Sequence, residues 1–216
     1  MKEKILVSDF DGTMTGRDFF RVALSRLPPG AAEPWERYEQ GLTSHFDALA
    51  EIFSGLRIDE TELDAMLAEM RVESGLTAAI NRLQQAGWSL VIASAGAAFY
   101  IERILLQNGI KALIHANSGD FTAGKGFFMQ QPRQSPFFVT DTGIDKAAVV
   151  RHYLEQGLET AFAGDGRPDL APALLVPPER RFARGWLATE LESRREPFVR
   201  FDKWRDIAGC LSGGAV

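Results

Sequence analysis

Two carboxylates stand close together near the start of the sequence. Asp9 and Asp11 belong to the segment Asp-Phe-Asp-Gly-Thr at residues 9–13, which follows an apolar run at residues 5–7. If that run forms a strand that continues this far, alternation places both carboxylates on the same side of it. Carboxylates so close repel each other and raise a pKa unless a cation neutralises them. Magnesium prefers such oxygen ligands, so the spacing indicates a site for a hard divalent cation.

A second acidic segment follows a later apolar stretch. Residues 160–163 predict a strand, and Asp165 and Asp169 come directly after it in the segment Gly-Asp-Gly-Arg-Pro-Asp. The carboxyl ends of parallel strands meet at one edge of a sheet, where ligands bind. We therefore expect Asp165 to complete the metal site with the first two carboxylates, and Asp169 to support it from behind.

Two further polar side chains are suited to binding an anion. Ser94 follows the predicted strand at residues 88–93 and precedes a helix, where a hydroxyl and free backbone N–H groups form an anion cradle. Lys146 begins the helix that leads into the next predicted strand, and it supplies a fixed positive charge at the same edge. Lys125, in a glycine-rich segment, is the alternative source of that charge.

The order of the predicted elements explains how these residues meet. An amphipathic helix, a glycine and a short apolar strand follow one another three times, with the glycines at Gly87, Gly109 and Gly157. Strands that alternate with helices of this length pair in parallel through right-handed crossovers. The sequence therefore predicts an α/β fold with a doubly wound, Rossmann-like parallel sheet.

Two segments interrupt this alternation. Between residues 17 and 72 the apolar spacing is helical, and we interpret residues 17–72 as a helical cap inserted after the first strand. Residues 1–16 and 73–216 then form the catalytic core. Residues 117–144 are irregular and contain several glycines, so we predict a β-hairpin or flap there.

Composition and charge restrict the classes of function. The 216 residues are 45% hydrophobic and 25% charged, which is ordinary for a globular protein, and the formal net charge is -5. Such a mildly acidic chain lacks the electrostatic signature of a nucleic-acid-binding protein. No apolar run approaches the ~20 residues that a membrane span requires, and the run near the N-terminus is too short for a signal peptide. With Cys210 as the single cysteine, we expect a cytoplasmic protein without a nucleic-acid or membrane partner; the motifs do not decide between a monomer and a homodimer.

Taken in order, the motifs resemble those of the haloacid dehalogenase superfamily of phosphatases. The superfamily's first motif, Asp-x-Asp-x-Thr, corresponds to residues 9–13. Its second, a serine or threonine after a strand, corresponds to Ser94, and its third, a lysine, to Lys146. Its fourth, an acidic pair after a strand, corresponds to Asp165 and Asp169. Each motif alone is weak, whereas the ordered set is specific.

Within the superfamily, the chain is similar to the phosphoserine-phosphatase-like branch, which carries a helical cap between the first two motifs. The stretches at residues 9–15 and 182–184 look closest to those of the methionine-salvage phosphatases that act on 2-hydroxy-3-keto-5-methylthiopentenyl-1-phosphate. Two features depart from that pattern. Pro168 stands where relatives carry a polar residue, and residues 117–144 lack a cysteine-rich segment.

The resemblance implies a magnesium-dependent phosphatase that hydrolyses a small phosphomonoester. It makes Asp9 the nucleophile that forms an aspartyl-phosphate, and Asp11 the general acid and base. It assigns Mg²⁺ to Asp9, Asp11 through its backbone carbonyl, and Asp165, with Asp169 supporting them.

The resemblance also implies how the substrate is bound. It assigns the phosphoryl group to Ser94, Lys146 and Gly12, and it places Asp18 toward the substrate at the start of the cap. Two alternatives stay open: a phosphoserine phosphatase or related phosphotransferase, and a catalytically idle binding or regulatory protein with the same fold.

Overall fold

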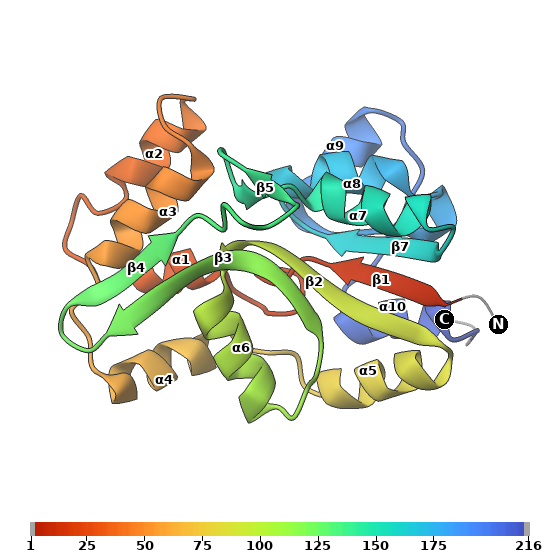
Figure 1. The fold of residues 1–216 in the computed structure, drawn as a ribbon, viewed down its shortest axis with the longest axis horizontal. Coiled ribbons are helices and arrows are strands. Elements are labelled where there is room, and N and C mark those ends of the chain that lie inside the picture. Colours follow the sequence, from red (N-terminus) through yellow and green to blue (C-terminus); the bar gives the residue numbers. More distant parts are fainter. Residues whose placement is uncertain (1–2, 214–216) are drawn as a thin grey trace.

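A seven-stranded sheet forms the centre of the molecule in the computed structural model, which describes residues 3–213 (Figure 1). The strand order is β4-β3-β2-β1-β7-β8-β9. Neighbouring strands pair in parallel except for β3 and β4, which are antiparallel. This order confirms the predicted doubly wound sheet. The strands are β1 (Lys4–Ser8), β2 (Trp88–Ala97), β3 (Leu113–Thr122), β4 (Gly126–Gln130), β7 (Glu159–Gly164), β8 (Arg181–Ala183) and β9 (Val199–Arg200).

Helices cover both faces of the sheet (Figure 1). In β1, Leu6 packs into the core beneath α5, α6 and α10, whereas Ile5 and Val7 pack into the core beneath α7, α8 and α9. A strand buried on both faces needs apolar residues at successive positions, which explains the apolar run that opens the sequence. The helices are α5 (Leu76–Gln85), α6 (Ala98–Gln107), α7 (Lys146–Glu155), α8 (Leu170–Leu175), α9 (Gly185–Ser193) and α10 (Trp204–Leu211), with short 3-10 turns at η1 (Arg167–Asp169) and η2 (Pro178–Arg180).

The segment between β1 and α5 is helical, as its apolar spacing predicts. The chain leaves the sheet at Thr15 and returns at Val72, and these two residues form an antiparallel bridge. Phe53 and Met66 from this segment belong to the same buried cluster as Leu6 of the sheet, so the division into a core and a separate cap stays a prediction. The helices are α1 (Phe19–Leu24), α2 (Glu33–Glu39), α3 (His45–Ser54) and α4 (Glu60–Glu69).

The irregular segment at residues 117–144 contains the predicted hairpin. β3 and β4 are antiparallel, with Thr122 opposite Gly126, and α3 packs against β4. A second, smaller hairpin is formed by β5 (Phe138–Val139) and β6 (Gly143–Ile144). β3 begins at Leu113, and the buried Ile110 before it packs into the same cluster as Leu6 of β1. Among the described residues, no helix has the length and apolar content to cross a membrane.

Candidate active site

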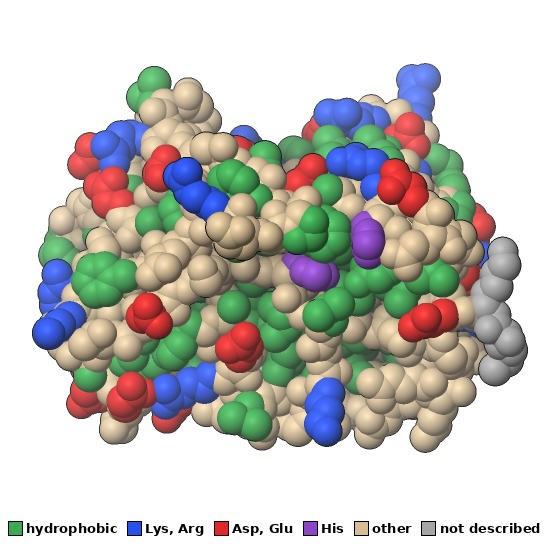
Figure 2. All heavy atoms as spheres, viewed as in Figure 1, with side chains coloured by type: hydrophobic (Ala, Val, Ile, Leu, Met, Phe, Trp, Pro, Cys, Tyr) green, Lys and Arg blue, Asp and Glu red, His purple; other side chains and the backbone are tan. Residues whose placement is uncertain are grey.

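A cavity of about 680 Å³ opens at the carboxyl ends of β1, β2 and β7. Asp9, Ser94, Lys146 and Asp165 line its sheet side, and residues of α1, α2 and α3 line the facing side. Figure 2 shows the surface hollowed between the raised parts of the molecule that contain α2 and α9 in Figure 1. The position agrees with the general location of ligands in open parallel sheets.

The register of the sheet brings the strand ends together. Ser8, the last residue of β1, pairs with Ile92 of β2 and Ala163 of β7. The chain then turns sharply, because the carbonyl of Phe10 accepts hydrogen bonds from the N–H groups at positions 13 and 14 (3.2 and 2.8 Å). This turn carries the residues that follow β1 over the ends of its neighbours.

Gly12 is required in this turn for two reasons. Its φ of +71° lies in the left-handed region that L-residues disfavour. A Cβ there would also lie 2.4 Å from Asp165 Oδ2 and 2.8 Å from Asp18 Oδ1. The N–H of Gly12 donates to the hydroxyl of Thr15 (3.1 Å). The absence of a side chain therefore lets Asp165 and Asp18 approach the turn from two sides.

Asp9 is buried at the floor of the cavity, with 5% of its surface exposed. Its Oδ1 accepts a hydrogen bond from Lys146 Nζ at 2.7 Å. The hydroxyl of Thr13 lies 3.1 Å from Asp9 Oδ2 and 3.0 Å from Asp165 Oδ1, so it bridges the two carboxylates. These contacts hold Asp9 in a single orientation with its carboxylate toward the cavity.

Lys146 is the buried cation of the site. It is the first residue of α7, and its Nζ lies 2.7 Å from Asp9 Oδ1 and 2.6 Å from Asp169 Oδ1. Although burial lowers it, the pKa of Lys146 is raised overall by the two carboxylates. Lys125, the alternative, is exposed in the turn between β3 and β4 and does not line the cavity. The structure thus brings Lys146, and not Lys125, to the acidic residues.

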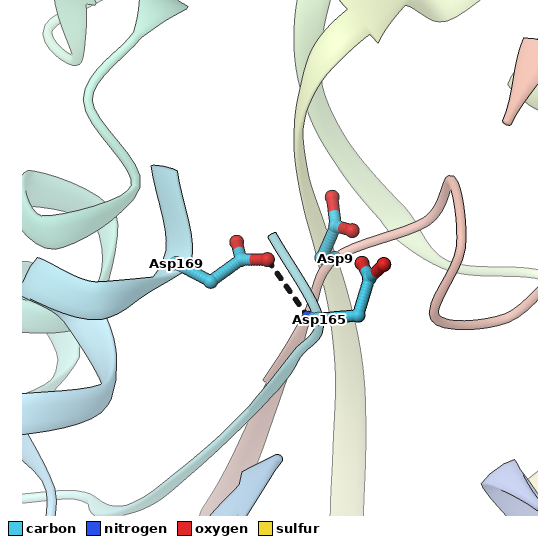
Figure 3. A group of neighbouring side chains, drawn as sticks. All are labelled: Asp9, Asp165 and Asp169. Atoms are coloured by element: carbon cyan, nitrogen blue, oxygen red, sulfur yellow. Dashed lines mark hydrogen bonds between the residues drawn. The ribbon is translucent and has the colours of Figure 1, made fainter. Parts of the chain in front are cut away.

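Three carboxylates form the acidic cluster at the floor: Asp9, Asp165 and Asp169, each with an oxygen within 4.8 Å of the others (Figure 3). Asp169 Oδ2 accepts hydrogen bonds from the N–H groups of Asp165 (3.0 Å) and Gly166 (2.9 Å). Its Oδ1 accepts a hydrogen bond from Lys146 Nζ, so Asp169 links Lys146 to the backbone at Asp165 and Gly166. The pyrrolidine of Pro168 does not disturb these contacts.

The acidic cluster fits a divalent cation. Burial, with the negative charges of Asp9 and Asp169, raises the pKa of Asp165 to about 9. A carboxyl group with such a pKa stays protonated at neutral pH unless a cation shares its site. Oxygen ligands of this kind suit a hard ion, and one or two carboxylates are the usual protein contribution to a magnesium site.

The side chain of Asp11 does not join the acidic cluster. β1 ends at Ser8, so the alternation that would place Asp11 beside Asp9 does not continue. Instead Asp11 Oδ1 accepts from the N–H of Phe19 (2.8 Å), and Oδ2 accepts from the hydroxyl of Tyr100 (2.5 Å). Burial and the charge of Asp18 together raise the pKa of Asp11 to about 7, although the two hydrogen bonds lower it. Asp11 is therefore able to hold a proton near neutral pH and to release it.

Ser94 lies within β2 and not after it, which corrects the predicted strand end. β2 continues to Ala97 because its last residue pairs with Asn117 of β3, and α6 begins only at Ala98. The hydroxyl of Ser94 accepts from the N–H of Gly96 (3.0 Å) and lines the cavity. Ser94 therefore reaches the cavity from a bent strand end and not from a helix N-terminus.

Asp18 lines the cavity immediately before α1. Its carboxylate does not cap this helix; it accepts from Arg21 Nε at 3.2 Å. Burial raises the pKa of Asp18, and the nearby guanidinium of Arg21 opposes that shift. Asp18 thus lies where the resemblance implies, with a positive partner already in contact.

Sequence reasoning gave no role to Tyr100, Gly96 or Arg184. A Cβ at Gly96 would lie 1.9 Å from the hydroxyl of Tyr100, so this glycine makes room for the tyrosine to reach Asp11.

Arg184 donates to the carbonyls of Gly12 (2.7 Å) and Thr15 (2.8 Å) and so fixes the turn after β1. Arg184 lies in the stretch at residues 182–184 that carries the resemblance, which is the one signal pointing to it. A tyrosine on a buried helix face is ordinarily core, so no pattern singles out Tyr100.

Comparison with known families decides the membership of this chain. Residues 6–174 match the family of haloacid dehalogenase-like hydrolases. The chain belongs to this family. The order of motifs from the first acidic turn to the acidic pair after β7 lies inside the matched region.

Relatives of known name are similar over nearly the whole chain. The 2-hydroxy-3-keto-5-methylthiopentenyl-1-phosphate phosphatase of Brevibacillus brevis is 26% identical over 220 residues, which cover 97% of this chain and 96% of the relative. The enzyme of the same name from Microcystis aeruginosa is 24% identical over 210 residues, which cover 96% of this chain and 97% of the relative.

Solved structures share the fold. A phospho-aspartyl intermediate analogue of phosphoserine phosphatase superposes with a TM-score of 0.67 at 15% identity, covering 96% of this chain and 98% of that chain. A probable phosphoserine phosphatase from Vibrio cholerae gives a TM-score of 0.72 at 22% identity, covering 98% of this chain and 64% of that chain.

Proposed function

We propose that this protein is a magnesium-dependent phosphatase that hydrolyses a small phosphomonoester through an aspartyl-phosphate. The observation that carries the proposal is the position of Asp9 on the cavity floor, between the Lys146 ammonium at 2.7 Å and the Thr13 hydroxyl at 3.1 Å. Beside it lies an acidic cluster suited to a divalent cation. A positioned carboxylate, a fixed cation and a metal site are the elements that phosphoryl transfer requires.

In the proposed reaction, a carboxylate oxygen of Asp9 attacks phosphorus while the P–O bond to the leaving group breaks. The leaving oxygen takes the proton held by Asp11, whose pKa of about 7 suits it to donate near neutral pH. Asp11 then takes a proton from a water molecule that attacks phosphorus in the aspartyl-phosphate. Inorganic phosphate leaves, and Asp9 is restored as a free carboxylate.

The remaining polar groups would bind the phosphoryl oxygens. Ser94 and Lys146 line the cavity with Asp9, and they would stabilise the charge on the transferring phosphoryl group. The N–H of Gly12 would exchange its hydrogen bond to Thr15 for one to a phosphoryl oxygen. These roles require small movements of side chains and of one hydroxyl, and no change in the fold.

The acidic cluster and one backbone group would hold the metal ion. Asp9, Asp165 and the carbonyl of Asp11 would coordinate Mg²⁺, and Asp169 would orient Asp165 and Lys146. When bound, the ion supplies positive charge that offsets the repulsion between the carboxylates and the charge of the phosphoryl group. The raised pKa of Asp165 supports this assignment, because a carboxylate in that position is stable only beside a cation.

Residues 17–72 would act as the cap in this proposal. Their helices form the side of the cavity that faces the acidic cluster, so they are placed to exclude water and to select the leaving group. The two chain segments joined by the antiparallel bridge between Thr15 and Val72 would be the hinge that connects this cap to the core at residues 1–16 and 73–216.

The leading substrate is the methionine-salvage enol phosphate for which the full-length relatives are named. Phosphoserine is the second candidate, supported by Asp18, whose carboxylate could pair with an amino group. The contact between Asp18 and Arg21 weighs against it, because that carboxylate already has a positive partner.

A screen of phosphorylated metabolites tests the function. Purified protein with Mg²⁺ is offered a panel that includes the enol phosphate and phosphoserine, and released phosphate is measured. We expect turnover of at least one member, and we expect Asp9→Asn to lower it by roughly 10³-fold or more because the nucleophile is lost. Mass spectrometry of rapidly quenched reactions should detect a phosphoryl adduct on Asp9.

Asp120→Asn is the matched control, because the same chemical change is made at an exposed residue of β3. It should keep full activity. Release of phosphate by Asp9→Asn at the normal rate would exclude Asp9 as nucleophile. Absence of turnover across the panel would favour an idle binding protein instead.

A further inference from the structure

One side of the cavity is an aromatic wall, which we define as Phe20, Trp35, Tyr38 and His45. Phe20 and Trp35 stack with ring centroids 4.0 Å apart. The His45 ring meets Trp35 and Tyr38 edge-on, at 5.5 and 5.1 Å between centroids. All four residues line the cavity that contains Asp9. The four rings pack against one another, so they form a surface for a ligand before any ligand binds.

His45 contributes a buried polar side chain to this wall, and no described residue hydrogen-bonds its Nδ1. Only 8% of its surface is exposed, and its Nδ1 is completely shielded with no hydrogen bond to any described residue. Two hydrogen bonds to Asp141 fix the backbone at His45. The N–H of His45 donates to Asp141 Oδ1 at 3.2 Å, and the N–H of Phe46 donates to the Asp141 carbonyl at 2.8 Å. Burying an imidazole without a partner is unfavourable, and such groups are rare unless they serve a ligand.

The charge state of the wall restricts what it can bind. Burial lowers the pKa of His45 to about 4, and the nearby Lys146 lowers it as well, so the imidazole is neutral at neutral pH and offers one donor and one acceptor. Two of the acidic groups beside the wall already have partners. Asp18 pairs with Arg21, and Glu39 accepts from the indole of Trp35.

The face of the wall is also unsuited to a cationic group. The guanidinium of Arg21 lies over the ring of Phe20, 5.1 Å from its centroid. A second cation placed on the same rings would be repelled by it. An uncharged ligand avoids this repulsion and avoids the desolvation of a charge against aromatic carbon.

We propose that His45 is a specificity-determining residue: a turn of its ring brings a nitrogen to the cavity, where it hydrogen-bonds a hydroxyl or carbonyl oxygen on an uncharged, flat or apolar leaving group that packs on the aromatic wall. This inference rests on the proposed phosphatase function, which places the phosphoryl group at Asp9 and the leaving group toward the helices. Its substrate class is an uncharged alcohol phosphate with one further oxygen, and it excludes a zwitterionic amino-acid phosphate.

A set of four synthetic substrates tests the inference. These are 2-phenylethyl phosphate and its three derivatives with one ring hydroxyl (ortho, meta and para isomers of one another), each of which adds a single hydrogen-bonding group far from the phosphate. In the wild-type protein, we expect at least one hydroxylated isomer to exceed the parent about tenfold in kcat/KM, the size of one hydrogen bond. His45→Phe keeps a ring in the wall and removes both nitrogens, so the ratio should fall to about one. His45→Gln keeps a hydrogen-bonding group and should retain part of the ratio.

A second measurement does not depend on the folding of these variants. In the inactive Asp9→Asn protein labelled with ¹⁵N-histidine, the preferred hydroxylated isomer should shift the imidazole resonances of His45, while the parent compound should leave them closer to the free values. His115 and His152 do not line the cavity and serve as internal controls.

Three outcomes would overturn the inference. The first is equal kcat/KM for all four compounds in the wild-type protein. The second is a preference that persists in His45→Phe. The third is faster turnover of phosphoserine than of all four compounds. Failure of the proposed function is distinct, because it would show as no phosphate release from these compounds or from any metabolite of the panel.

Discussion

Asp9 and Asp11 are two residues apart, yet the structure gives their carboxylates different surroundings. Asp9 contacts the ammonium of Lys146, whereas Asp11 contacts the hydroxyl of Tyr100 and a backbone N–H. Burial raises the pKa of Asp11 to about 7. Separate environments for two neighbouring carboxyl groups are a common way to divide the roles of nucleophile and acid.

Removal of the Tyr100 hydroxyl should raise the pKa of Asp11 further. The hydrogen bond from Tyr100 stabilises the ionised form and lowers this pKa, and a bond to a charged group is worth roughly 1.5–3 kcal/mol, or about one to two pKa units. In Tyr100→Phe, the alkaline fall of kcat/KM, where Asp11 loses its proton, should move upward by about one to two pH units. kcat should also fall, because Asp11 loses one of the two contacts that orient it.

Tyr153→Phe is the matched control for this pH profile. Tyr153 is a buried tyrosine of α7 that does not line the cavity. Its variant should keep the wild-type profile. An unchanged alkaline limb in Tyr100→Phe, or one displaced to lower pH, would contradict the role given to Tyr100.

At the scale of elements, one asparagine connects the strand ends that carry the site. Asn117 of β3 donates from Nδ2 to the carbonyls of Ala95 (2.8 Å) and Thr142 (2.9 Å). Ala95 follows Ser94, and Thr142 lies shortly before Lys146. The bent end of β2 and the segment that leads to α7 are therefore held together through a single buried side chain.

Gly143 makes this connection sterically feasible, and its replacement should be costly. A Cβ at Gly143 would lie 1.7 Å from Asn117 Oδ1, and the φ of this glycine is +80°. Gly157, after α7, has a φ of +73° and open space around it. Gly157→Ala should lower the free energy of unfolding by about 1 kcal/mol from the backbone conformation alone. Gly143→Ala should lower it by roughly 2–4 kcal/mol, because crowding adds to the same conformational cost.

Urea denaturation of the two variants measures this difference. Gly143→Ala should also reduce phosphatase activity, because displacement of Asn117 shifts Ser94 and Lys146 together. Equal loss of stability in both variants would show that the clash with Asn117 is relieved by movement elsewhere.

For the whole molecule, the buried carboxyl groups couple stability to pH and to metal. The pKa of Asp11 is raised from 3.8 to about 7, and that of Asp165 to about 9. Between pH 4 and these values, the folded protein binds more protons than the unfolded chain, so stability falls as the pH rises. A bound divalent cation removes much of this penalty at Asp165, because it favours the ionised form.

The melting temperature in the presence of a chelator should therefore decrease from pH 5 to pH 9. Addition of Mg²⁺ should raise the melting temperature. This rise should be larger at higher pH, because the Asp165 carboxyl group must lose its proton to bind the ion. Asp165→Asn should melt higher than wild type in chelator at pH 8 and should show a much smaller increment with Mg²⁺. Thermal melts followed by circular dichroism check each part.

Asp120→Asn again provides the matched control, since it changes the net charge equally without touching the acidic cluster. It should follow the wild-type curves in chelator and in Mg²⁺. If the rise in melting temperature caused by Mg²⁺ did not depend on pH, or if it persisted in Asp165→Asn, the cation would bind elsewhere.

Much of the fold follows from local pattern. The apolar runs at β1, β2 and β7 and the glycines after the amphipathic helices are sufficient to predict parallel strands, because backbone periodicity is determined by near neighbours. Strand ends are less predictable. β2 extends to Ala97 through pairing with β3, a contact between segments that the sequence does not mark as partners.

The sequence by itself determined the residue types of the site and their order along the chain, and hence the family. It placed Asp9, Ser94 and Asp165 after predicted strands and Lys146 at the start of a helix, and a parallel sheet brings the carboxyl ends of its strands to one edge. Only the tertiary structure decided which groups contact each other. Lys146 meets Asp9 across 137 residues, Tyr100 meets Asp11 across 89, and His45 is left without a partner in the cavity. Such contacts depend on the packing of distant helices against the sheet, and periodicity in a single sequence carries no information about that packing.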